Sequence, residues 1–280
     1  MRVVWQLVAV VAVSAIGGRS ATAALDRDPW LALAVGVLTA VVAVPVYGWV
    51  VRRTEHRPST EVARQGAGAA LVRGTVIGVV LCGAVIANLA FLGYYTVDGL
   101  GSPSGAVGLF GFMAAAAVTE ELLYRGFLFR IIEERTGTWI ALTLTGVLFG
   151  LAHLLNPHAS LVGAIAIAIE AGGMLGAAYI ATRNLWVPIG LHFGWNFALG
   201  GIFSTEVSGN DTQQGLLDAA TSGPALISGG DFGPEGSLYT VVFGVLTTIV
   251  FLWLAHRRGH LKPRRRRTER AGATTATLAR

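Results

Sequence analysis

Long runs of apolar residues, separated by short polar segments, make up most of the chain. A helix needs about 20 such residues to cross the hydrocarbon core of a bilayer. The runs show no strict apolar–polar alternation, no heptads and no internal repeat. This pattern predicts an all-α, polytopic membrane protein with about eight transmembrane helices packed in a bundle. The predicted spans are residues 3–18, 31–51, 74–95, 105–129, 138–155, 161–181, 185–203 and 238–255.

The composition agrees with a membrane protein and excludes two other classes. Hydrophobic residues make up 53% of the chain and charged residues only 13%, whereas a soluble domain carries about 25% charge. A water-soluble globule and a disordered chain are therefore both excluded. The 37 glycines predict closely packed helices. Cys82 is the single cysteine, so neither an intramolecular disulfide nor a cysteine-based zinc site can form.

The first apolar run resembles a cleaved signal peptide, because it ends in Ala21-Thr22-Ala23. We favour a retained helix, and with its N-terminus inside the cell the cytoplasmic segments hold 18 of the 21 Lys and Arg residues. The positive-inside rule then predicts that both termini are cytoplasmic. The chain has 20 Arg for one Lys and is rich in Ala and Gly, which indicates a GC-rich bacterial source and hence the bacterial inner membrane.

Four segments follow from this organisation. Residues 1–104 form N-terminal transmembrane helices and loops, and residues 105–203 form the core that carries the chemistry. Residues 204–256 form an outer loop, which lacks Lys and Arg, and the last transmembrane helix. Residues 257–280 form a basic cytoplasmic tail, which includes Arg264–Arg267 and is expected to be disordered. Such a tail beside a hydrophobic segment favours contact with anionic lipid and does not indicate nucleic-acid binding.

Polar groups inside the predicted spans are the candidates for chemistry, since a charge at the bilayer centre costs from about 3 kcal/mol upward. Glu121 and Arg125 are i, i+4 neighbours and can form an ion pair, whereas Glu120 lies about 100° around the helix and has no such partner. His192 and Asn196 lie one turn apart on one helical face. The full set, which predicts a polar intramembrane cavity, is Glu120, Glu121, Arg125, His153, Glu170, His192 and Asn196.

Two kinds of hydrolytic site can be built from these residues. A carboxylate and a histidine can activate a water, while a second histidine and an amide stabilise the resulting oxyanion. Alternatively, Glu120, His153 and His192 could bind zinc and leave one position open for water. The chain has no HExxH motif, no GxSxG motif and no nucleophilic cysteine in a suitable context.

The depth of these residues in the membrane is a difficulty for a single site. At about 1.5 Å per residue, Glu120, His192 and His153 lie about 15, 10 and 22 Å from the inner boundary. Either the fifth span begins below the membrane surface or Pro188 bends the seventh span. Glu170 is unexplained: it could line the cavity or pair with an Arg or His of another helix.

Three motifs resemble the CPBP family of intramembrane proteases, which includes the type II CaaX prenyl endopeptidases and bacteriocin-processing or immunity relatives. They are EExxxR at Glu120, Glu121 and Arg125, FxxxH at Phe149 and His153, and HxxxN at His192 and Asn196.

The resemblance covers about Gly105 to Leu199 and implies a helical bundle whose polar cavity opens toward the cytoplasm. It also implies that Glu120 and His153 activate water, that His192 and Asn196 stabilise the oxyanion, and that Glu121 and Arg125 support them. The family has been described both as metal-dependent and as glutamate-dependent; we favour the second, with no cofactor.

The sequence therefore predicts an intramembrane endopeptidase that cleaves a membrane-associated protein or peptide. A non-catalytic bacteriocin self-immunity or scaffold protein would keep the same motifs for binding. A proton-coupled transporter could use the same ionisable residues as a relay, but such proteins usually show internal repeats, which this chain lacks.

Overall fold

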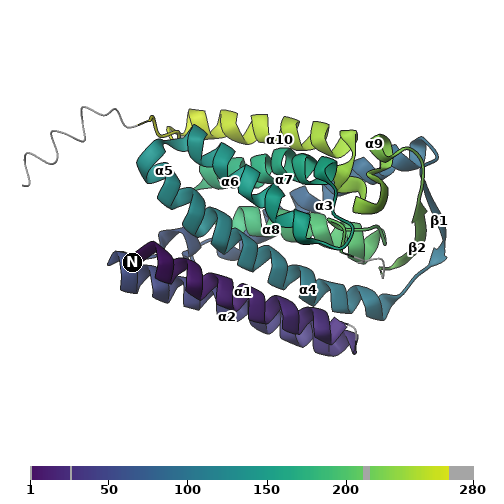
Figure 1. Ribbon diagram of the computed structural model, residues 1–280, viewed down its shortest axis with the longest axis horizontal. Helices are drawn as coiled ribbons and strands as arrows, with labels where there is room; N and C mark the ends of the chain where they lie inside the picture. Colours follow the sequence, from purple (N-terminus) through teal and green to yellow (C-terminus); the bar gives the residue numbers. More distant parts are fainter. Residues whose placement is uncertain (1, 26, 211–214, 265–280) are drawn as a thin grey trace, which may run out of the picture.

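The computed structural model describes residues 2–25, 27–210 and 215–264, and long helices packed side by side make up most of it (Figure 1). The long helical elements are α1 (Arg2–Leu25), α2 (Pro29–Glu55), α3 (Ala67–Phe91), α4 (Pro103–Glu121), the π-helix η2 (Leu122–Phe129), α5 (Arg130–Thr136), α6 (Thr138–Ala152), α7 (Leu161–Thr182), α8 (Trp186–Asn196), the π-helix η4 (Phe197–Ile202) and α10 (Leu238–Arg257). The short elements are η1 (Thr60–Val62), β1 (Tyr95–Leu100), η3 (His153–Leu155), β2 (Leu217–Thr221), α9 (Ala225–Ser228), η5 (Gly230–Phe232) and η6 (Pro234–Gly236).

The prediction of an all-α polytopic membrane protein is confirmed. Each of the eight predicted spans is helical, but the count of eight membrane crossings is not confirmed. Within the described residues, the helices that are long and apolar enough to cross a membrane are Pro29–Glu55, Ala67–Phe91, Pro103–Thr136, Thr138–Leu155, Leu161–Thr182 and Leu238–Arg257. Neither α1 nor α8 is among them, and α8 is only eleven residues long.

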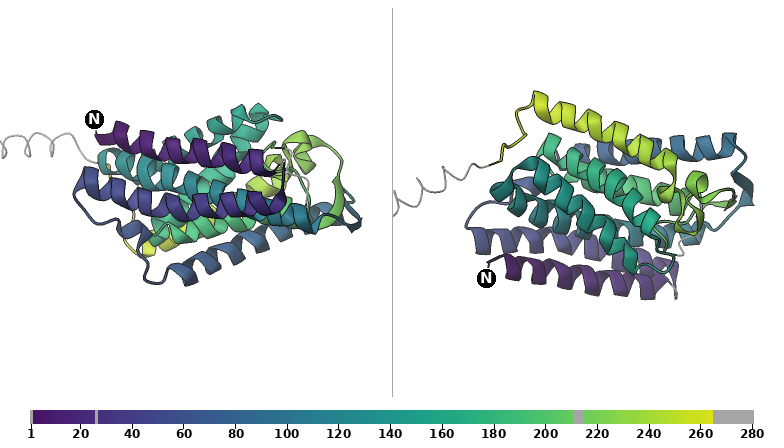
Figure 2. Two further views of the ribbon diagram at one scale, coloured as in Figure 1. Left: turned by 90° about the horizontal axis from the view of Figure 1, so that it is seen from below. Right: turned by 45° about the horizontal axis from the view of Figure 1, so that its top comes forward.

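The helices form a bundle in which α1 and α2 lie together along one side and α10 lies on the opposite side, against α7 (Figure 2). Glycines allow close contacts inside this bundle. At the α3–α8 crossing, a Cβ added to Gly78 would lie 2.3 Å from the Leu191 carbonyl oxygen. At the α2–α4 crossing, a Cβ added to Gly36 would lie 2.1 Å from the Gly111 carbonyl oxygen. The high glycine content therefore does bring helix backbones together.

The two ends of the bundle differ in chemistry. Strands β1 and β2 pair antiparallel at one end, which we call the strand end, with an irregularity in register between Val97 and Gly99. The sequence pattern did not predict these strands, because a two-residue-period signal is weak in segments of five or six residues. The loop that follows η4 also folds onto this end, where the Gly209 N–H donates to the Phe232 carbonyl.

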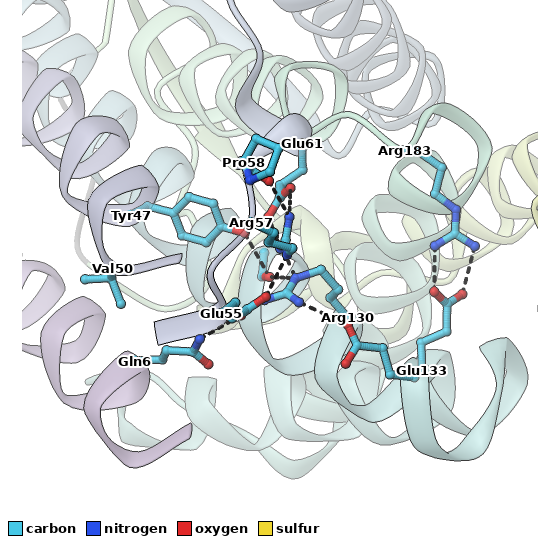
Figure 3. Close-up of polar contacts among 12 residues, drawn as sticks. Gln6, Tyr47, Val50, Glu55, Arg57, Pro58, Glu61, Arg130, Glu133 and Arg183 are labelled. Carbon is cyan, nitrogen blue, oxygen red and sulfur yellow. Dashed lines mark hydrogen bonds and ion pairs between the residues drawn. The ribbon is translucent and has the colours of Figure 1, made fainter. Parts of the chain in front are cut away.

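The opposite end, which we call the basic end, is held by a network of ion pairs that joins the α2–α3 linker to η2 and α5 (Figure 3). Glu61 is buried and accepts hydrogen bonds from Tyr47 and Arg57, while Arg130 pairs with Glu55. Burial raises the pKa of Glu61, but the hydrogen bonds from Arg57 and Tyr47 outweigh this effect and hold the pKa below its ordinary value. Glu61 is therefore ionised, and its hydrogen bonds with Tyr47 and Arg57 hold the linker against the bundle.

A second part of the basic end fastens the segment after α10. Glu133 is buried and accepts two hydrogen bonds from Arg183, at 2.6 and 2.9 Å (Figure 3). Lys262 Nζ lies 3.1 Å from the same carboxylate, and the backbone N–H of Lys262 donates to the Thr138 hydroxyl. The first residues of the predicted tail thus contact the bundle, whereas residues 265–280, including Arg265–Arg267, lie outside the described residues.

We expect Gly78→Ala to destabilise the protein by roughly 1–3 kcal/mol, because the new methyl group would force α3 away from the α8 backbone. Thermal unfolding of the purified protein in detergent measures the effect. Gly83→Ala in the same helix is the matched control, since nothing lies within 4 Å of its added Cβ. Equal unfolding temperatures for the two variants would contradict the close α3–α8 contact.

Candidate active site

The predicted ion pair between Glu121 and Arg125 forms at the centre of the bundle. Arg125 Nη1 lies 2.6 Å from Glu121 Oε1, and both side chains are almost fully buried. The Arg125 guanidinium also donates to the Ala171 carbonyl at 3.1 Å and lies 4.7 Å from the centre of the Phe149 ring. Arg125 therefore connects the α4–η2 helix to α7 and to α6.

His192 lies between the two neighbouring glutamates. Its Nδ1 is 3.1 Å from Glu121 Oε1, so the Nδ1–H donates to the same carboxylate that binds Arg125. Its Nε2 is 3.9 Å from Glu120 Oε2, which is beyond hydrogen-bond distance. Because Glu121 fixes the ring from one side, the other nitrogen is held facing Glu120.

Glu120 differs from Glu121 in its surroundings. Its side chain is 34% exposed, while Glu121 has no exposed surface. The Oε2 atom of Glu120 is buried and has no hydrogen-bond partner. As the i, i+4 spacing predicts, Arg125 pairs with Glu121 and not with Glu120, although Oε2 of Glu121 also lacks a hydrogen-bond partner.

Glu120, His153 and Asn196 meet in one cavity of about 280 Å³ between α4, η2, the end of α6 and the end of α8. His192 does not line this cavity, but its Nε2 lies 3.9 Å from Oε2 of Glu120, which is a lining residue. The polar residues that line it are Glu120, Tyr124, His153, Asn156, Asn196, Ser208 and Asn210. Four of them, Tyr124, Asn156, Ser208 and Asn210, were not proposed from the sequence: Tyr124 is at a variable position of the EExxxR motif, and the other three lie outside the predicted spans.

His153 lies at the start of η3, directly after α6. Its Nδ1 is 2.8 Å from the Phe149 carbonyl oxygen, one turn earlier. Since a carbonyl only accepts, Nδ1 carries the proton in the neutral ring and Nε2 is left as an acceptor. In the FxxxH motif, the backbone carbonyl of Phe149 therefore sets the tautomer of His153.

Glu120 and His153 line one cavity, although the sequence predicts different depths in the membrane for them. The estimate assumed one regular helix from Glu120 to Arg130, but η2 is a π-helix over most of that distance, and such helices have i→i+5 hydrogen bonds and different dimensions. The alternative that Pro188 bends the seventh span is wrong. Pro188 is in the first turn of α8, which is continuous from Trp186 to Asn196, and proline is tolerated there.

A second, smaller cavity of about 10 Å³ lies behind His192 and is lined by His153, Asn196, Glu170 and Glu235. This volume fits about one water molecule. Glu170 is fully buried, and neither of its carboxyl oxygens has a hydrogen-bond partner. Of the two alternatives for Glu170, it lines a cavity and does not pair with an Arg or His of the described residues.

Glu235 is a buried acid that the sequence analysis placed in the outer loop without a role. It accepts hydrogen bonds from the Trp195 indole at 2.9 Å and from the Ser208 hydroxyl at 2.7 Å. Trp195 directly precedes Asn196, so the loop is attached to the helix that carries the HxxxN motif. In the sequence Pro234-Glu235-Gly236, an acid between two turn residues is typical of an exposed loop, so no signal could have revealed this role.

The structure does not group the three residues of the alternative zinc site as metal ligands. In the part of the chain that the structure describes, no three His, Cys, Asp or Glu side chains are grouped so that they could hold a metal ion. Glu120 and His192 approach each other to 3.9 Å, but His153 does not complete a ligand set with them.

Comparison with known proteins supports the resemblance seen in the motifs. Residues 102–198 match the type II CAAX prenyl endopeptidase Rce1-like family. This segment runs from the start of α4 to η4 and contains all three motifs. The family implies an intramembrane endopeptidase of the CAAX type. No match was found among curated proteins or solved structures.

The cavity lies toward the strand end of the bundle. Asn156, Ser208 and Asn210 come from loops at that end, where the His158 N–H donates to the Gly209 carbonyl. The arginines counted as cytoplasmic gather at the basic end, as the Glu133–Arg183 pair illustrates. The cavity is therefore lined by loops at the end of the bundle opposite to these basic residues.

We expect Glu121→Gln to destabilise the protein by roughly 3–5 kcal/mol, because it leaves the buried Arg125 charge without its counter-ion. Glu120→Gln is the matched control: it makes the same change one residue earlier, but removes no partner of Arg125. Unfolding temperatures of the two purified variants measure the difference. The double variant Glu121→Gln, Arg125→Met is expected to recover part of the loss, and two equally stable single variants would contradict the assignment.

Proposed function

We propose that the chain is an intramembrane endopeptidase that hydrolyses a peptide bond of a membrane-associated protein or peptide at the cavity between Glu120, His153 and Asn196. The observation that carries this proposal is the place of Glu120, which lines the cavity and whose Oε2, without a hydrogen-bond partner, lies 3.9 Å from His192 Nε2. An acceptor without a donor, in a cavity large enough for water and substrate, is a suitable position for a general base.

The attacking water is proposed to bind beside Glu120 and His153. Glu120 Oε2 accepts one of its protons, and His153 Nε2, left free by the Nδ1 hydrogen bond to Phe149, holds the water in place. The water oxygen attacks the carbonyl carbon of the scissile bond. The proton held by Glu120 then passes to the leaving amine nitrogen as the carbon–nitrogen bond breaks. No protein atom is covalently bound to the substrate at any stage.

His192 and Asn196 are proposed to stabilise the oxyanion of the tetrahedral intermediate. Asn196 can donate through its amide. His192 can donate through Nε2 only when both ring nitrogens carry protons, because Nδ1–H is already bound to Glu121. The carboxylates of Glu121 and Glu120, at 3.1 and 3.9 Å, favour this positively charged ring. Arg125 in turn holds the Glu121 carboxylate in place through the ion pair.

The substrate is proposed to reach the site from the non-cytoplasmic side of the membrane. Two observations support this direction: the cavity lies at the strand end, and the basic residues lie at the other end. A bacterial chain also need not have a prenylated substrate. Peptide maturation, self-immunity and turnover of membrane proteins are each compatible with such a site.

We expect Glu120→Gln to abolish cleavage while leaving the fold intact, because Gln cannot accept the proton of the attacking water. The measurement compares peptide N- and C-termini in membranes that contain wild type or variant at equal abundance. Glu134→Gln, which removes a 44% exposed carboxylate of the same helical run, is the matched control. Products that persist in Glu120→Gln at normal abundance would exclude the assignment.

Two further outcomes of this comparison are informative. Identical termini in membranes with wild type, with Glu120→Gln and without the protein would support a non-catalytic immunity or scaffold protein. If cleavage occurs but is lost on chelation and restored by zinc, the reaction depends on metal, contrary to the proposal.

The orientation predicts which end of the bundle a membrane-impermeant maleimide can label in intact cells. In a Cys82→Ser background, Asp98→Cys at the strand end should be labelled, and Gln65→Cys at the basic end should be labelled only after the cells are opened. Both positions are exposed, so accessibility within the protein does not limit the reaction. Labelling of Gln65→Cys alone would place the cavity on the cytoplasmic side.

A further inference from the structure

A large groove on the outside of the bundle is distinct from the active-site cavity. It has a volume of about 880 Å³ and is bounded by α2, α3, α4, α8 and the linker before α3. On α4 it is lined by Phe110, Ala114 and Val118, whereas the active-site cavity is lined by Met113, Ala116 and Glu120 of the same helical run. With 100° between successive residues, these two sets lie on different faces of the helix.

The groove is apolar over most of its length and accessible from the membrane. Val41 of its wall is 63% exposed, and α2, α3 and α4 are all long and apolar enough to cross a bilayer. Its volume lies in the range of roughly 300–1,000 Å³ that is typical of small-molecule sites. Membrane lipids surround such helices at high concentration, and their acyl chains are apolar.

One end of the groove is positively charged. Arg52 and Arg64 line it there, and neither forms an ion pair within the described residues. The nearby acids are already neutralised, since Glu55 and Glu61 are bound by Arg57 and Arg130. The two lining arginines therefore leave an uncompensated positive charge at the basic end.

Arg52 and a hydroxyl group surround a space at this end that suits a phosphate. A Cβ built on Gly48 would lie 3.1 Å from Ser59 Oγ and 3.6 Å from Arg52 Nη1, so both polar groups face the same small space beside the α2 backbone. Glycine at position 48 keeps this space open. A phosphate oxygen placed there could accept hydrogen bonds from the hydroxyl and from the guanidinium.

We propose that this groove binds one anionic phospholipid, with an acyl chain along α2 and α4 and the phosphate between Arg52, Arg64 and Ser59. Charge complementarity selects the anionic headgroup, and the apolar wall selects the chain. The same linker contacts α8, because the Leu185 N–H donates to the Glu61 carbonyl and the Trp186 indole to the Ala63 carbonyl. The bound lipid would thus support the start of the helix that carries His192 and Asn196.

The test measures lipid binding to the purified full-length protein by native mass spectrometry. The probes are phosphatidylglycerol and phosphatidylcholine with identical acyl chains. Wild type should retain phosphatidylglycerol in preference to phosphatidylcholine. The double variant Arg52→Gln, Arg64→Gln should bind phosphatidylglycerol about fivefold more weakly for each charge removed.

Two further variants separate this groove from general attraction of lipid to a basic surface. Arg53→Gln, Arg73→Gln removes two exposed arginines that do not line the groove, and should leave binding unchanged. Ala114→Phe places a ring in the middle of the groove and should reduce binding of both lipids. Unfolding temperatures in detergent establish that each variant is folded.

Three results would overturn the proposal. Equal losses in the two double-arginine variants would indicate only non-specific surface charge. Unchanged lipid binding in Ala114→Phe would place the lipid elsewhere. A change in oligomeric state with Ala114→Phe, without a change in lipid binding, would indicate that a second copy of the chain occupies the groove.

Discussion

The ion pair between Glu121 and Arg125 is the interaction on which the rest of the site depends. Two opposite charges in the interior of a membrane protein are tolerated only when they neutralise each other and have further hydrogen bonds. Here Arg125 also binds a backbone carbonyl of α7 and lies over the Phe149 ring of α6, while Glu121 binds His192 of α8. One pair thus fixes the relative positions of α7 and of the three helical segments that carry the three motifs.

The two adjacent glutamates have different surroundings in this arrangement. Glu121 Oε1 binds both Arg125 and His192, so Glu121 is placed to position His192 in the proposed reaction. Glu120 lacks such partners and faces the cavity, where it can exchange a proton. The close α3–α8 crossing, made possible by Gly78, holds α8 at the distance that this geometry requires.

The sequence was sufficient to predict the helices and most of the candidate site, because membrane spans and the i, i+4 spacings within a helix are local properties. The Glu121–Arg125 pair and the unpaired Glu120 follow from such spacings. The cavity that joins Glu120, His153 and Asn196 could only be suspected, since the expected depths spread over about 12 Å at 1.5 Å per residue. The depths were counted along regular helices, whereas η2 is a π-helix between Glu120 and Arg130.

Features that depend on contacts between distant segments were not predicted. The pairing of β1 with β2 joins residues more than a hundred positions apart, and neither strand has a strong pattern by itself. The burial of Glu235 requires the Trp195 indole, which comes from a different element. For the same reason, the sequence did not predict the groove, whose walls come from α2, α3, α4 and α8.

The protonation of His192 tests the central role of Glu121 most directly. Nitrogen-15 NMR of histidine-labelled protein, with His192 assigned by comparison with His192→Gln, distinguishes which ring nitrogens carry protons. The account predicts a proton on Nδ1 of His192 at neutral pH, held by the Glu121 carboxylate. An Nδ1 without a proton, in folded protein whose other histidine signals are unchanged, would contradict it.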